Sequence, residues 1–432
     1  MNCLSGLRIR ALSAALLSLA VIVACGVELS ESADSPIERT YDAHYRVTVD
    51  PGQSAVDVEL EIRQPRQFLR EMTFSSLPDT LGDFSGDGDV LIGDGKLQWL
   101  PPAGGGTLRW RAHVAHRRGN KSYDAWLGPD WGMFRAEDII PRARTRTLKG
   151  ATSNTTLSFV LPRSWSVVTE YAGTDDPIRI HRADRRFDQP TGWMLVGGIG
   201  VRRETIAGVR VAVAGPMGHA VRRMDMLALL NWTLPELVAL LPDPPTRLTI
   251  VSAGDPMWRG GLSAPSSLYI HADRPLISEN ATSTLLHEVV HSAASIKSRP
   301  GADWIVEGLA EFYSLSLLER GGAISARRYQ VAVSQQAEWA GKASFLCGPN
   351  STGANTALAV TVLHALNKEI EEKTGGANNL DDLFRQVIAS ESAIGVAELR
   401  DIATKIIGQP SDALHSDNLP GCSRIAPGEE SS

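Results

Sequence analysis

The strongest chemical signal in this sequence is the run His287-Glu288-Val289-Val290-His291, which lies in an apolar stretch. Side chains four residues apart share one face of a helix, so both imidazoles can bind the same zinc ion. Glu288 lies about 100° around that helix, where it can take a proton from a zinc-bound water. The pattern predicts a hydrolase that uses one Zn²⁺ per chain.

A second segment supplies the remaining ligand. After the turn at Pro300-Gly301, Glu307 follows His291 by 16 residues on a predicted second helix. It completes a set of two histidines and one glutamate that leaves a position open for water. Glu311 is one turn further along, on the same face, where it can hold a ligand imidazole by its other nitrogen. Gly308 weakens a helix by about 1 kcal/mol relative to alanine, so we expect a close approach of another backbone or of the metal site there.

Other chemistries fit less well. Without a metal, two histidines and two glutamates on apolar helices would be buried with too few partners, which is costly. A serine hydrolase would need a G-x-S-x-G nucleophile turn, and the sequence has none.

Composition restricts the remaining classes. The chain has 432 residues, of which 43% are hydrophobic and 21% charged, as expected for folded domains and more than one of them. The net charge of −6 lacks the basic surplus that a nucleic-acid partner would require, so none is expected.

The N-terminus resembles a bacterial lipoprotein signal. Arg8 and Arg10 precede an apolar stretch at 11–24, and its 14 residues would rise only about 21 Å as a helix, too little to span a bilayer. We expect residues 1–24 to be removed and Cys25 to carry a lipid; plain cleaved secretion is the alternative. The predicted location is the cell envelope, with the membrane as a partner through this anchor. Gly26 favours the outer membrane if the cell is Gram-negative.

Two cysteines then remain for the folded part. Cys347 and Cys422 form an even pair in an oxidising compartment, which favours one disulfide. Two buried free thiols are the alternative.

The chain divides by pattern into successive parts. Residues 25–39 read as a polar tether, and 40–215 as a β-rich domain that opens with a hairpin at Tyr45–Ile62. Residues 216–330 contain the zinc motif, 331–422 are helical, and 423–432 form a tail. We expect an α+β protein, with an antiparallel β-rich domain before the catalytic domain and helices at the C-terminal end.

Four pieces between Trp258 and Ile388 resemble the glycyl aminopeptidase family of gluzincin zinc peptidases. They occur in the family's order and cover about a third of the chain. The pieces are the loop Arg259-Gly260-Gly261-Leu262, HEVVHSAASIKSRP from His287, WIVEGLAEFYSLSLLERGGAIS from Trp304, and Gly353–Ile388 with its Leu380-Asp381-Asp382-Leu383. The resemblance implies a thermolysin-like catalytic domain, zinc as cofactor, and a peptide substrate bound along the loop 260–263.

Two positions depart from the family. Ser263 replaces the loop glutamate that can bind a substrate's terminal amine, and Asn350 replaces the tyrosine expected to stabilise the oxyanion. Asn350 is therefore a candidate catalytic donor, with His364 in reserve, although a core histidine is the favoured interpretation of His364. The family's trailing PDZ domain is not expected in this chain.

The sequence thus predicts a lipid-anchored zinc peptidase of the cell envelope, in which a zinc-bound water activated by Glu288 cleaves peptide bonds. The alternative is an envelope lipoprotein that binds zinc and peptides with little or no turnover. Retention of Glu288 favours the enzyme, because zinc binding alone does not require that residue.

Overall fold

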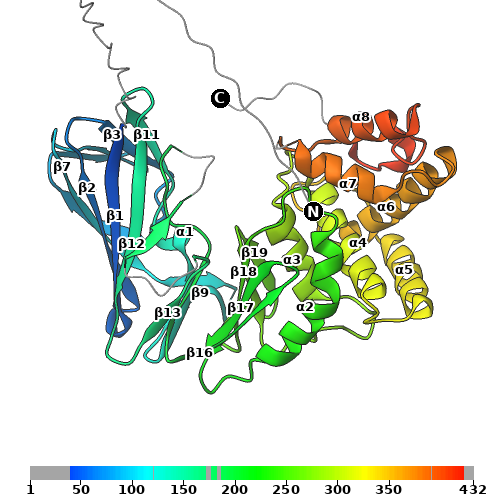
Figure 1. Ribbon diagram of the computed structural model, residues 1–432, viewed down its shortest axis with the longest axis horizontal. Helices are drawn as coiled ribbons and strands as arrows, with labels where there is room; N and C mark the ends of the chain where they lie inside the picture. The colour runs from blue at the N-terminus through cyan, green and yellow to red at the C-terminus, as the bar shows by residue number, and fades with distance from the viewer. Residues whose placement is uncertain (1–38, 120, 172–176, 182–185, 391, 423–432) are drawn as a thin grey trace, which may run out of the picture. The chain divides into compact units, whose positions relative to one another are not determined.

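The computed structural model describes residues 39–422 except 120, 172–176, 182–185 and 391 (Figure 1). The predicted signal at 1–24, the lipidation site Cys25, nearly all of the tether and the tail at 423–432 lie outside the described residues. Within the described part, no helix has the length and apolar character needed to cross a bilayer.

The first part of the chain consists of three β-sheets. The predicted hairpin is confirmed: Tyr45 pairs with Leu60 and Val47 with Val58, with their alternate side chains buried. One pairing, between the first strand and the strand beginning at Thr152, is parallel, and the other described pairings in these sheets are antiparallel. The strands are β1 (Thr40–Asp50), β2 (Ala55–Arg63), β3 (Leu69–Ser75), β4 (Leu81–Gly86), β5 (Asp89–Gly93), β6 (Lys96–Leu100), β7 (Gly105–His113), β8 (Ala115–Arg118), β9 (Ser122–Leu127), β10 (Trp131–Arg135), β11 (Ala143–Thr147), β12 (Thr152–Val160), β13 (Ser166–Val168), β14 (Ile178–Ile180) and β15 (Trp193–Gly197).

All three sheets contribute to one hydrophobic core, and the sheet that contains β15 and β10 also faces the next part of the chain. The sheet orders are β14-β12-β1-β2-β7-β4, β13-β15-β10-β9-β8 and β11-β3-β6-β5. Short helices interrupt the strands at Pro51–Gln53 and at α1 (Ala136–Ile139). The sheet containing β15 and β10 contributes Trp193, Leu195 and Met133 to a cluster shared with the fourth sheet.

The fourth sheet has the order β16-β17-β18-β20-β19. Its strands are β16 (Ile199–Ile206), β17 (Val209–Pro216), β18 (Arg247–Ala253), β19 (Gly261–Ala264) and β20 (Ser267–His271). β16 and β17 form a hairpin before residue 216, where the catalytic domain is predicted to begin, and β17 pairs in parallel with β18 after it. Because a hairpin at this point has the same alternation as the hairpins before it, the sequence pattern contains no sign that the chain has changed sheets.

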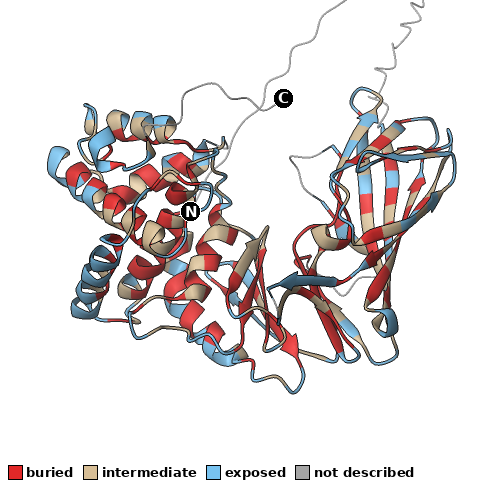
Figure 2. Cartoon of the chain, turned by 180° about the vertical axis from the view of Figure 1, so that it is seen from behind, coloured by how far each residue is buried: buried red, intermediate tan, exposed pale blue. Residues whose placement is uncertain are grey.

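Helices cover one face of this sheet and complete the chain. They are α2 (Arg223–Val238), α3 (Thr284–Ala294), α4 (Asp303–Arg320), α5 (Ala326–Ala340), α6 (Ala354–Lys373), α7 (Leu380–Ala389), α8 (Val396–Ile407) and a short turn at Ser416–Asn418. Figure 2 shows buried residues along the faces where these helices meet and exposed residues on their outer sides. The expected class, a β-rich region followed by an α+β region and C-terminal helices, is confirmed.

Two sequence features of this helical region have a direct structural explanation. A Cβ at Gly308 would lie 2.8 Å from the Cβ of Ala359, so this glycine lets α4 and α6 approach closely. Cys347 and Cys422 form the predicted disulfide, which joins the segment before α6 to the end of the described chain.

Candidate active site

The two histidines of the motif lie one turn apart on α3. Ser283 caps this helix by accepting a hydrogen bond from the backbone N–H of Leu286, and α3 packs its apolar side against the sheet. The Nε2 atoms of His287 and His291 lie 3.1 Å apart, so both rings converge on one point beside the helix. The helix therefore presents two nitrogen ligands at the spacing the sequence predicts.

Glu307 closes the ligand set from α4. Its two carboxylate oxygens lie 3.3 Å from His287 Nε2 and 3.3 Å from His291 Nε2. One ligand atom from each of the three residues lies within 4.8 Å of the others. Two imidazole nitrogens and one carboxylate oxygen around a common point are the donors that a catalytic zinc site uses, so the residues present fit this metal.

The other ring nitrogen of His287 has a partner on the same helix as Glu307. Its Nδ1 lies 3.1 Å from Glu311 Oε2, and Gln336 of α5 donates a hydrogen bond of 3.3 Å from Nε2 to Glu311 Oε1. A proton on Nδ1, shared with Glu311, leaves Nε2 free to act as a ligand. The carboxylate thus fixes both the orientation and the tautomer of the imidazole.

In the metal-free cluster, the pKa of each histidine or glutamate depends on hydrogen bonds and charges of the others. Burial would lower the pKa of the His287 imidazole, but hydrogen bonds with Glu307 and Glu311 outweigh it and raise the pKa to about 10. Burial would raise the pKa of Glu307, but hydrogen bonds from His287 and His291 hold it at about 2. The cluster therefore carries a proton at neutral pH, which a bound cation would have to displace.

Glu288 faces a different neighbour, the edge strand β19. Its side chain is buried, and a Cβ at Gly261 would lie only 2.7 Å from Glu288 Cγ and 2.9 Å from Oε1. Gly261 is thus the residue that lets β19 pass directly over the carboxylate. Gly260 is constrained separately, because a Cβ there would lie 2.1 Å from atoms of the Trp258 ring.

Ser263, at the position where the resemblance expects a glutamate, lies on the same short strand. Burial raises the pKa of Glu288, while the neighbouring His287 and His291 charges and a hydrogen bond with Ser263 act in the opposite direction. Ser263 therefore places an uncharged hydroxyl near the carboxylate, where a glutamate would have supplied a second negative charge. Burial remains the largest effect, so the carboxyl group is more basic than an exposed glutamate.

The β-rich region holds the edge strand in position. Trp193 Nε1 donates a hydrogen bond of 3.0 Å to the carbonyl of Leu262, and Tyr269 Oη donates to the carbonyl of Trp258 at 2.8 Å. The backbone N–H of Trp258 donates to the carbonyl of Tyr123 on β9 at 2.9 Å. The segment predicted to bind substrate, residues 260–263, is thereby anchored at both of its ends.

The two oxyanion candidates lie in different surroundings. Asn350 is exposed between the disulfide and α6, and in the described part of the chain no hydrogen bond joins its side chain to the histidines or glutamates of the cluster. His364 on α6 packs against Phe312, with ring centroids 4.6 Å apart, and burial lowers its pKa to about 4. The ring is partly buried, and in the described structure its Nε2 has no hydrogen-bond partner, so it is not the satisfied core histidine that the sequence favours.

Gln336 is the residue of this cluster that the sequence did not reveal. It lies on α5, largely within the part expected to be helical, between Ala332 and Ala340 at four-residue intervals, and all three are buried. Two sequence features indicate this residue. Ser325 marks the start of the helix, and Gln336 lies between two alanines on one helical face.

Comparisons with known proteins agree on the fold. No family model matches the chain, and no curated protein matches it by sequence. An aminopeptidase N family protein from Idiomarina loihiensis superposes with a TM-score of 0.62 at 14% identity, over 86% of this chain and 72% of that one. Two structures of native leukotriene A4 hydrolase from yeast, one of them from Saccharomyces cerevisiae, have TM-scores of 0.53 and 0.54 at 14% identity. They cover 85% and 90% of this chain and 64% and 68% of theirs. The expected aminopeptidase-like fold is confirmed.

Proposed function

We propose that this protein is a zinc-dependent peptidase. The observation that carries the proposal is the convergence of His287, His291 and Glu307 on one point, with Glu288 buried beside it under a strand edge. The fold shared with an aminopeptidase N family protein supports the same activity. Bound zinc would lower the pKa of a coordinated water and polarise the scissile carbonyl.

Three side chains near the bound zinc would then have separate roles. Glu288 takes a proton from the attacking water and delivers it to the leaving amine, and its raised pKa makes it a stronger base than an exposed glutamate. Glu311 holds His287 in the tautomer that a ligand needs. Ser263 places a hydroxyl on β19 near Glu288, where it favours the ionised carboxylate.

The substrate would lie along β19. This strand is at the edge of its sheet, and in the described structure it pairs only with β20. An extended peptide can add to such an edge as a further strand, which would carry its scissile bond past Glu288. Gly261 keeps the strand close enough to the helix for that geometry.

The position of Ser263 bears on which peptides are cleaved. A buried substrate ammonium needs a carboxylate partner, because a desolvated charge without one is expensive. Ser263 has no charge to offer, so we propose that the enzyme does not depend on a free amino terminus. The side chain of Asn350 is the oxyanion donor proposed from the sequence.

We also propose a location in the cell envelope, from the N-terminal sequence alone. The signal at 1–24 and the lipidated Cys25 would anchor the enzyme in the bacterial cell envelope, at the outer membrane if the cell is Gram-negative. The disulfide between Cys347 and Cys422 is in keeping with an oxidising compartment.

A zinc-containing peptide-binding protein without turnover is the second candidate, favoured by the replacement of the loop glutamate and of the tyrosine. Metal analysis and peptide-library digestion of the purified protein separate the two. The enzyme should contain about one zinc per chain, cleave peptides, lose this activity with a chelator and regain it with zinc. A protein that takes up zinc and binds peptides but cleaves none would be the second candidate, and a protein that takes up no zinc would exclude both.

A further inference from the structure

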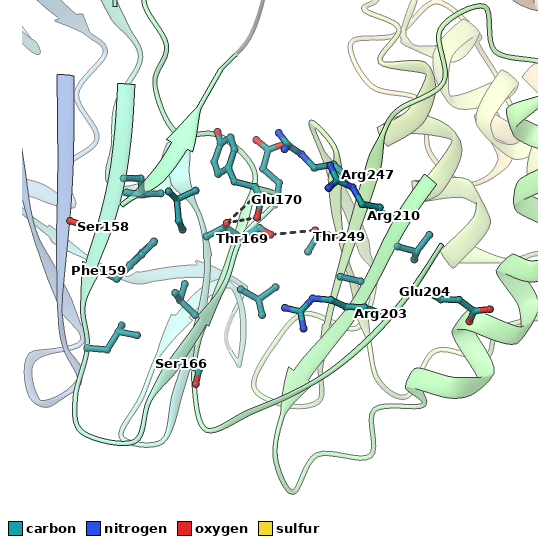
Figure 3. A pocket seen from close by; sticks show the side chains of 18 of the residues that line it. Ser158, Phe159, Ser166, Thr169, Glu170, Arg203, Glu204, Arg210, Arg247 and Thr249 are labelled. Atoms are coloured by element: carbon teal, nitrogen blue, oxygen red, sulfur yellow. Dashed lines mark hydrogen bonds between the residues drawn. The ribbon is translucent and has the colours of Figure 1, made fainter. Parts of the chain in front are cut away.

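A cavity of about 900 Å³ lies away from the zinc-ligand cluster, against strands β16, β17 and β18 (Figure 3). The cluster adjoins β19, which is at the opposite edge of the same sheet from β16. The remaining walls come from the β-rich region, from the ends of β12 and β14 and from β13 and the residues after it. The volume is within the range of small-molecule binding sites.

Three arginines from three adjacent strands line one side of this cavity. Arg210 of β17 is in register with Arg247 of β18 and with Thr205 of β16, and Arg203 lies two residues before Thr205. Because side chains alternate between the faces of a strand, all three arginines are on the same face. Figure 3 shows them extending from neighbouring strands toward the cavity.

This arrangement is unfavourable without a counter-charge, since like charges on neighbouring strands repel. In the part of the chain that the structure describes, none of the three guanidinium groups forms an ion pair; Arg247 instead lies over the Tyr171 ring, 5.4 Å from its centroid. A sheet face with three such cations side by side is what an anion would stabilise.

Two glutamates also line the cavity. Glu170 is buried and accepts a hydrogen bond of 2.6 Å from Thr191 Oγ1. Glu204 extends from the other face of β16 and accepts a hydrogen bond of 3.0 Å from Asn231 Nδ2 of α2. Glu204 is therefore on the opposite face of β16 from Arg203.

The wall facing the arginines is apolar. Phe159, Leu161, Val167 and Ile178 line it, and each is only partly buried against the core of the β-rich region. A hydrogen bond of 3.3 Å from Thr249 Oγ1 to the carbonyl of Thr169 joins the two walls. The cavity thus offers a cationic side and an apolar side that face each other.

We propose that this cavity binds an anionic amphiphile, with a carboxylate or phosphate head on Arg203, Arg210 and Arg247 and an alkyl tail along the apolar wall. Guanidinium groups match carboxylate and phosphate oxygens in bidentate geometry, and the partly covered apolar side chains gain from burial under a tail. Free alkyl phosphates or fatty acids and the head of a membrane lipid share this chemistry.

Calorimetric titration of the full-length chain tests the proposal. The probes are dodecyl phosphate, laurate, dodecyltrimethylammonium and inorganic phosphate, each below its micelle concentration. The two anionic amphiphiles should bind one per chain, at least tenfold more tightly than the cationic amphiphile and than inorganic phosphate. Vesicles containing an anionic phospholipid, compared with neutral vesicles, show whether a membrane lipid also serves as the source. If the cation binds as well as the anions, or inorganic phosphate as well as dodecyl phosphate, the proposal is wrong.

Substitutions locate the site. Replacing Arg203, Arg210 and Arg247 together by glutamine should weaken dodecyl phosphate binding at least tenfold, and the single variants should each weaken it severalfold if the triple variant does not fold. Arg202→Gln is the matched control, because this exposed neighbour alternates to the other face of β16. Unchanged affinity in all arginine variants would assign the binding to another part of the chain and overturn the proposal.

Discussion

His287 Nδ1 and Glu311 Oε2 lie 3.1 Å apart, so a carboxylate on the next helix holds the ring whose Nε2 faces the proposed metal position. Gln336 holds the other oxygen of that carboxylate, and the three residues come from α3, α4 and α5. The orientation of the metal ligand is therefore a property of how three helices pack.

This relationship predicts the effect of Glu311→Gln. The amide keeps the size of the side chain but loses the charge that favours a proton on Nδ1. Zinc affinity should fall about 10–100-fold with the fold intact. Competition with a chromophoric chelator measures it, and Gln336→Ala should have a smaller effect, because that residue acts only through Glu311. An unchanged zinc affinity in Glu311→Gln would show that the contact does not orient the ligand.

Zinc binding should also depend on pH. In the metal-free protein the pKa of His287 is about 10, so the imidazole is protonated at neutral pH and must lose its proton to become a ligand. Between pH 6 and 8 the apparent affinity should rise by up to about tenfold per pH unit, with release of about one proton. Calorimetry in buffers of different ionisation enthalpy at pH 7.5 counts this proton. A binding enthalpy that is the same in every buffer would contradict the prediction.

The close approach of β19 to α3 predicts a second effect on activity. Gly261→Ala would place a Cβ 2.7 Å from Glu288 Cγ, so the strand or the glutamate must shift. The ratio kcat/KM should fall by an estimated tenfold or more while zinc content stays unchanged, since misplacing a catalytic group by about 1 Å can cost about 10²-fold. Gly82→Ala is the control, because a Cβ there meets nothing within 4 Å. Full activity in Gly261→Ala would mean that the strand edge does not constrain Glu288.

Ser263 predicts an unusual tolerance for blocked substrates. With no charge at this position to pair with a terminal ammonium, N-acetylation of a cleaved peptide should change kcat/KM by less than about tenfold, or about 1.4 kcal/mol of transition-state stabilisation. Paired kinetics on the free and acetylated forms of one peptide measure this. A loss of a hundredfold or more would show that another carboxylate binds the amine.

Local spacing made the centre of the site predictable. The four-residue interval of His287 and His291 is a property of one helix, and Glu307 follows in an adjacent one, so their convergence requires little tertiary information. Gln336 could not be placed in the same way, because its role depends on how α5 packs against α4. The arginine row depends likewise on strand register: Arg210 and Arg247 are 37 residues apart in the sequence and adjacent in the sheet. Asn350 is expected at the oxyanion position from the family resemblance alone, and in the structure it lies exposed between the disulfide and α6.

The central claim is that Glu288 performs catalysis at a zinc site formed by His287, His291 and Glu307. The most direct test compares Glu288→Gln with the wild type and with Glu338→Gln, an exposed glutamate of α5, for zinc content and for kcat/KM on one cleaved peptide. We predict that all three proteins contain about one zinc per chain, that Glu338→Gln cleaves like the wild type, and that Glu288→Gln is slower by about 10²-fold or more. A zinc-loaded Glu288→Gln that cleaves as fast as the wild type would contradict the account.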